Sequence, residues 1–285
     1  MVKEIWYGDI KKGRGRLENE LTDKMRELTK RIGNKYGKDI DILLTEEPIK
    51  LMIEIYRRHG EDTRGLEDTP ARDLTLNSRD IEGKLEWVTI ILDAYVLNVI
   101  GQINMVGEVR EEESMCARVI LHEIGHAHWN IRHKSADYGK YTHETKRVGK
   151  NMISAWDALH LIEEYNADLY AYGKIVNEYG KSKLKYLAEN NVKMLREVLD
   201  KNKGYGLTSK LTILIATITS YRQLYGNKCI VKAEKISQRG KILIGDIDFT
   251  MYSCWKIVKD RNKIDAYIDQ IVNNVDYVLR LVNGF

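Results

Sequence analysis

The sequence predicts an α+β fold that is mainly helical, with a small sheet near the N-terminus and a helical lobe at the C-terminus. The chain has 285 residues, 43% of them hydrophobic and 31% charged, with only 2 prolines. Such a chain can bury a sizeable core and is neither disordered nor of low complexity. Most stretches with the period of a strand precede residue 94, and beyond residue 154 the apolar period is mainly helical.

The first 93 residues are expected to supply the sheet. Apolar residues recur every three or four positions in the stretch before residue 37 and predict a helix there. Alternation over 39–45 predicts a strand, and a helix is expected over 48–58. The stretch 60–83 shows little period and is expected to be loop, whereas the β-branched run at 85–93 is the clearest strand. For 95–104 a hairpin and a helix both fit.

The remainder is expected to be helical. A helix over about 111–130 has Glu111, Glu112 and Glu113 in its first turn, where the helix dipole favours negative charge. A second helix over about 154–179 has one apolar stripe and stops at Gly180. Helical period also marks 184–199, 211–225 and 264–282, and 241–248 is expected to be a short strand. We therefore predict one domain over 1–180 and a helical C-terminal lobe over 181–285.

The charge and the cysteine content of the chain indicate which partners to expect and in which cellular compartment the protein lies. The net charge of +4 and the pI of about 8.7 fall short of a nucleic-acid-binding stripe, so no nucleic-acid partner is expected. The longest apolar stretch, 87–101, contains Asp93 and Asn98 and is too short to span a bilayer, so no membrane association is expected. No apolar leader opens the chain, and its three cysteines lack Cys-x-x-Cys spacing, which favours reduced thiols and a cytoplasmic location.

The most informative motif is His122-Glu123-Ile124-Gly125-His126, on the helix predicted over 111–130. At 3.6 residues per turn, the two histidines lie about 40° apart around the axis and about 6 Å apart along it, so both rings can reach one metal ion. Zinc suits such ligands. Glu123 lies about 100° round from His122, where it can take a proton from a water that the metal activates.

A zinc hydrolase also needs a third protein ligand and an open position for water. On the helix over 154–179, Glu164 and Asp168 share a face, so Glu164 could bind the metal while Asp168 accepts the other ring N–H of a ligand histidine. Three alternatives remain open. His133 is one residue out of the metzincin register, Glu163 leaves Asp168 without a role, and His160 precedes Glu164 by one turn.

The pairing of the first motif with Glu164-Tyr165-Asn166-Ala167-Asp168 resembles the gluzincin zinc metallopeptidases, the clan of thermolysin. The sequence around the second motif is loosely similar to that of the CAAX-prenyl-protease-like and the ImmA/IrrE-type peptidases. This resemblance covers about 111–173 and implies that the domain over 1–180 is a zincin-like catalytic domain. It further implies that His122, His126 and Glu164 bind one zinc ion, that Glu123 is the general base, and that Asp168 orients a ligand histidine.

The resemblance also bears on the substrate. It suggests that the strand over 85–93 is an edge that lines the cleft and pairs with an extended peptide; an ordinary buried strand is the alternative. No histidine follows His160, so the group that stabilises the oxyanion stays open among five candidates, namely Tyr165, Tyr205, Tyr221, Arg222 and Tyr252.

These observations predict a soluble zinc-dependent metallopeptidase that hydrolyses peptide bonds in a peptide or protein substrate. Glu123 acts as general base toward water and then returns the proton to the leaving amine. The alternative is a structural or regulatory metal-binding protein with a zincin-like fold and no turnover.

Overall fold

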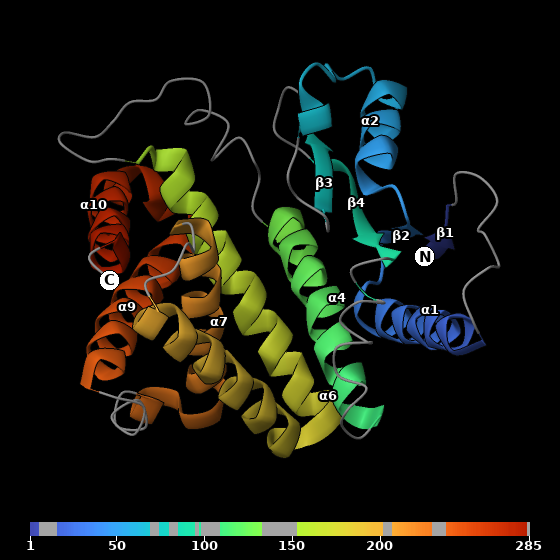
Figure 1. Cartoon of the computed structure of the whole chain (residues 1–285). Coiled ribbons are helices and arrows are strands. Elements are labelled where there is room, and N and C mark those ends of the chain that lie inside the picture. The colour runs from blue at the N-terminus through green and yellow to red at the C-terminus, as the bar shows by residue number, and fades with distance from the viewer. Residues whose placement is uncertain are drawn as a thin grey trace. The chain divides into compact units, whose positions relative to one another are not determined.

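The computed structural model describes residues 1–5, 16–68, 74–79, 85–94, 97, 109–132, 153–201, 207–229 and 238–283 (Figure 1). The chain divides into two compact units, Met1–Arg132 and His133–Phe285. The boundary expected after residue 180 lies within the second of these units. Each unit is described by itself.

The N-terminal unit is built on a four-stranded sheet with the order β1-β2-β4-β3. β1, β2 and β4 are parallel, and β3 is an edge strand that runs antiparallel to β4. The strands are β1 (Val2–Glu4), β2 (Asp41–Thr45), β3 (Leu74–Arg79) and β4 (Leu85–Asp93). The strands expected over 39–45 and 85–93 are confirmed.

Two expectations about the sheet are wrong. The stretch expected to be loop over 60–83 contains β3, whose short alternation of apolar and polar residues lies between long polar segments. The strand over 85–93 is not an edge, because β4 lies between β2 and β3. Six consecutive residues of β4 are buried, the pattern of a strand in the middle of a sheet. The edge is β3.

Helices cover both faces of the sheet. On one face, α2 (Pro48–Arg58) packs its apolar side on a cluster that includes Leu43, Leu76 and Ile91. On the other face, α1 (Arg16–Tyr36) comes close to β1 and β2 at Gly33. A Cβ on Gly33 would lie 2.6 Å from Val2 Cγ2, so only glycine permits this approach.

The helix that carries the first motif is α4 (Val109–Arg132), as predicted. It contacts α1, β3 and β4. A row of fully buried apolar residues holds it in place: Ile120, Leu121, Ile124 and Ala127. The ring Nε2 of His128 lies 2.8 Å from the carbonyl oxygen of Tyr36, the last residue of α1. This packing fixes the rotation of α4 about its axis.

In its described part, the C-terminal unit is helical (Figure 1). Its long helices are α6 (Ala155–Lys201), α7 (Leu207–Tyr225), α9 (Gln238–Val258) and α10 (Ile264–Asn283). The helical lobe is thus confirmed, and the predicted stop at Gly180 coincides with a break inside α6, at φ 80° and ψ 171°.

The prediction of a short strand over 241–248 is wrong. This stretch belongs to α9, in which Ile244, Ile247, Met251, Cys254 and Val258 are buried at helical spacing. The eight-residue window was too short to separate the two periods. No helix in the described part of the chain is long and apolar enough to cross a bilayer.

Candidate metal centre

The two motif histidines of α4 point at each other. Their Nε2 atoms are 3.1 Å apart, and the ring planes are inclined by 77°. Two nitrogens bound to one tetrahedral zinc ion, each at 2.0–2.1 Å, would be about 3.3 Å apart. The two rings are within hydrogen-bond distance of each other, and this separation is close to the one that two ligands of a single zinc ion would have.

Glu123, the motif glutamate, is 8% exposed and is held by the edge strand β3. The hydroxyl of Thr75 lies 2.8 Å from Glu123 Oε2, to which it donates, and 3.2 Å from the Glu123 carbonyl oxygen. Sequence reasoning missed Thr75, because its strand was expected to be loop. The signal that could have found it is the alternation Leu74-Thr75-Leu76-Asn77, which places Thr75 and the leucines on opposite faces.

In the C-terminal unit, the start of α6 is fixed by a reciprocal cap. The Ser154 hydroxyl accepts a hydrogen bond from the backbone N–H of Asp157, and Asp157 Oδ2 accepts one from the backbone N–H of Ser154. This arrangement is a capping box. It sets where the first turn of α6 begins, two and a half turns before Glu164.

The face of α6 that follows holds the second motif. The side chain of Glu164 is 35% exposed, and His160 Nε2 lies 3.7 Å from its Oε1, so the two share a face as predicted. Asp168, one turn later, is 2% exposed. Its burial is what an orienting carboxylate requires, and its expected role toward a ligand histidine stays a prediction.

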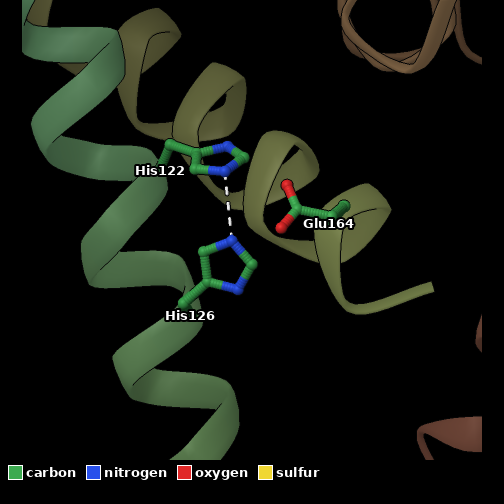
Figure 2. Close-up of side chains that lie close together, drawn as sticks. All are labelled: His122, His126 and Glu164. Atoms are coloured by element: carbon green, nitrogen blue, oxygen red, sulfur yellow. Dashed lines mark hydrogen bonds between the residues drawn. The ribbon is translucent and has the colours of Figure 1, made fainter. Parts of the chain in front are cut away.

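The alternative third ligands differ in their surroundings. His160 is 51% exposed and stacks on the Trp156 ring at 5.3 Å, and Glu163 Oε2 lies 3.9 Å from His160 Nδ1. His133 lies outside the described residues. Among the described residues, the one group that could hold a metal ion is His122, His126 and Glu164, whose ligand atoms lie within 4.8 Å of one another (Figure 2).

Two of the five residues considered for stabilising the oxyanion make their contacts inside the C-terminal unit. Tyr165 is fully buried, and burial raises the pKa of its phenol. Arg222 donates two hydrogen bonds to Asp248, at 2.8 and 2.6 Å, and its guanidinium lies 3.6 Å from the centre of the Tyr252 ring. Tyr205 lies outside the described residues. The oxyanion group therefore stays open.

In comparisons with protein-family models, with curated proteins and with solved structures, nothing matches this chain. The resemblance to gluzincins accordingly rests on the two sequence motifs, beside the geometry of His122, His126 and Glu164.

Proposed function

We propose that the protein is a zinc-dependent metallopeptidase, with His122, His126 and Glu164 as ligands of one zinc ion and Glu123 as general base. The observation that carries the proposal is the convergence of two imidazole nitrogens and a carboxylate oxygen within 4.8 Å. Zinc commonly takes this set of donors in hydrolases, where the fourth position is left for water. The partly exposed Glu164 suits an open position, because a closed structural site would be expected to bury it.

The residues around the proposed ion have complementary tasks. When bound, zinc would polarise the scissile carbonyl and make a neighbouring water more acidic. Glu123, which does not belong to the ligand group, accepts the proton of that water and delivers it to the leaving amine. Asp168 keeps its proposed task of orienting a ligand histidine.

The edge strand supports a peptide as substrate. Among the described strands, β3 pairs with β4 alone and lies at the end of the sheet order. It also carries Thr75, whose hydroxyl bonds to Glu123. An extended peptide that added to the outer side of β3 would therefore run close to the general base.

The third ligand can be tested with two neighbouring isosteric variants. We expect wild type to bind about one equivalent of zinc, measured by mass spectrometry of the metal content and by competition with a chelator. Glu164→Gln and His122→Ala should lower zinc affinity by at least about 100-fold, more than the loss of an orienting residue. Glu163→Gln and His160→Ala are the matched controls and should retain it. Unchanged affinity in Glu164→Gln would refute the proposed centre.

The general base is tested with Glu123→Gln. We expect this variant to retain about one equivalent of zinc and to lose about 10²- to 10⁴-fold in hydrolysis, because the amide cannot take a proton from water. A diverse peptide library with mass-spectrometric detection of cleavage gives the rate whichever sequence is cleaved. Zinc loss in Glu123→Gln would make Glu123 a ligand. Zinc binding without cleavage by wild type would favour the structural or regulatory alternative.

A further inference from the structure

We propose that Thr75 is the positioning residue for Glu123, and that its hydroxyl fixes which carboxylate oxygen receives the proton. The inference rests on the proposed function. Its basis is the 2.8 Å hydrogen bond that Thr75 Oγ1 donates to Glu123 Oε2. With Oε2 engaged by the hydroxyl, we infer that Oε1 is the oxygen that takes the proton of the reacting water.

The sheet determines where the hydroxyl points. Leu74 and Leu76, on either side of Thr75, pack on the cluster beneath α2. Because side chains alternate along a strand, Thr75 points to the opposite face, toward α4. Its strand partner is Ile90, which is fully buried on the same face. Thr75 therefore has a fixed backbone and a fixed direction.

The chemistry of the contact suits a positioning role. A hydroxyl hydrogen bond to a carboxylate is charge-assisted and stronger than a neutral one. Glu123 is 8% exposed, so little water competes for the same oxygen. The Glu123 carbonyl oxygen lies farther from Thr75 Oγ1, at 3.2 Å, so the single hydroxyl proton goes to the closer carboxylate oxygen. A carboxylate held in this way keeps one orientation between turnovers, as efficient proton transfer requires.

The test combines Thr75→Val, which removes the hydroxyl at nearly constant shape, with Thr75→Ser, which retains it. On a peptide that wild type cleaves, Thr75→Val should lower kcat by about tenfold or more and leave KM within about threefold. A readout independent of turnover is acetohydroxamate, a zinc chelator that donates a proton to a neighbouring carboxylate. Its dissociation constant with the zinc-loaded protein should rise about tenfold in Thr75→Val. Thr75→Ser should restore both values.

Two controls separate positioning from packing. Thr29→Val removes a buried hydroxyl of the same unit, which donates to the Met25 carbonyl at 2.7 Å, and should change neither kcat nor acetohydroxamate binding. In a Glu123→Ala background, Thr75→Val should no longer affect acetohydroxamate binding, because the group that it orients is gone.

Failure of this inference differs from failure of the proposed function. Equal acetohydroxamate binding by wild type and Thr75→Val, or an effect of Thr75→Val that persists in Glu123→Ala, would overturn the positioning role and leave the peptidase proposal standing. Acetohydroxamate binding that depends on both Thr75 and Glu123, without cleavage of any library peptide, would support the positioning role and refute the peptidase.

Discussion

At the scale of single residues, local spacing determined the histidine pair, and packing determined its surroundings. The positions of His122 and His126 follow from the helix period alone, and their Nε2 atoms are 3.1 Å apart. No such rule connects Thr75 with Glu123, because 48 residues separate them along the chain. Contacts of this kind depend on how a strand and a helix are brought together.

Another contact of this kind leads to a prediction at the residue scale. Asp248 is 2% exposed and accepts two hydrogen bonds from Arg222 on α7. Asp248→Asn should lower the free energy of unfolding by about 3 kcal/mol, because it leaves the guanidinium of Arg222, 14% exposed, without its buried counter-charge. Unfolding in urea at pH 7, followed by circular dichroism, measures this change.

Asp260→Asn is the matched control for this measurement. Its carboxylate pairs with Lys263 at 2.9 Å, and both side chains are about half exposed. Solvent screens such a pair, so the urea midpoint should not change measurably. An equal effect of the two substitutions would show that burial does not set the strength of the Arg222–Asp248 pair.

At the scale of elements, long periodic segments were predictable and short ones were not. The helices over 48–58 and 111–130 and the strand over 85–93 were found where the pattern placed them. β3 was missed because six residues hold too few alternations to stand out from a polar segment. The opposite error was the strand expected over 241–248. These eight residues cover only about two turns of an apolar helix, too few to show the helical period.

The break in α6 leads to a prediction at the element scale. Gly180 has φ 80° and ψ 171°, a conformation essentially restricted to glycine, and open space surrounds its Cβ position. Gly180→Ala should therefore lower the free energy of unfolding by about 1–3 kcal/mol through backbone strain alone. Urea unfolding of the full chain gives the value.

Gly173→Ala, in the helical part of α6, is the paired variant. Its Cβ would lie 3.4 Å from Gln223 Nε2, the mobile end of a side chain. Alanine in a helix interior is favoured over glycine by about 0.5–1 kcal/mol, so no loss of stability is expected. If Gly180→Ala left the stability unchanged, as Gly173→Ala should, the positive-φ conformation described for Gly180 would be contradicted.

At the scale of the whole molecule, each unit buries the cysteine side chains that it contains. Cys116 lies in the N-terminal unit, Cys229 and Cys254 lie in the C-terminal unit, and all three are buried thiols that form no disulfide. Burial raises the pKa of the Cys254 thiol, and the hydrogen bond from Asn274 offsets this effect only in part. The reactive thiolate is therefore disfavoured near neutral pH.

We accordingly expect slow alkylation of the native protein. Iodoacetamide at pH 8 should modify the three cysteines at least about tenfold more slowly than it does in urea, as followed by mass spectrometry of the intact chain. In urea, three equivalents should be incorporated. Fast modification of one site in the native state would identify a cysteine that its unit does not bury, and peptide mapping would show which.

The sequence by itself determined the fold class, most helices, two of the strands and the pairing of His122 with His126, because each of these follows from a period of two or 3.6 residues. Tertiary structure alone decided that β3 is the edge of the sheet and that Thr75 bonds to Glu123. The physical reason is that strand order and helix packing are set by burial and hydrogen bonding between segments far apart in the chain, and no local period encodes them.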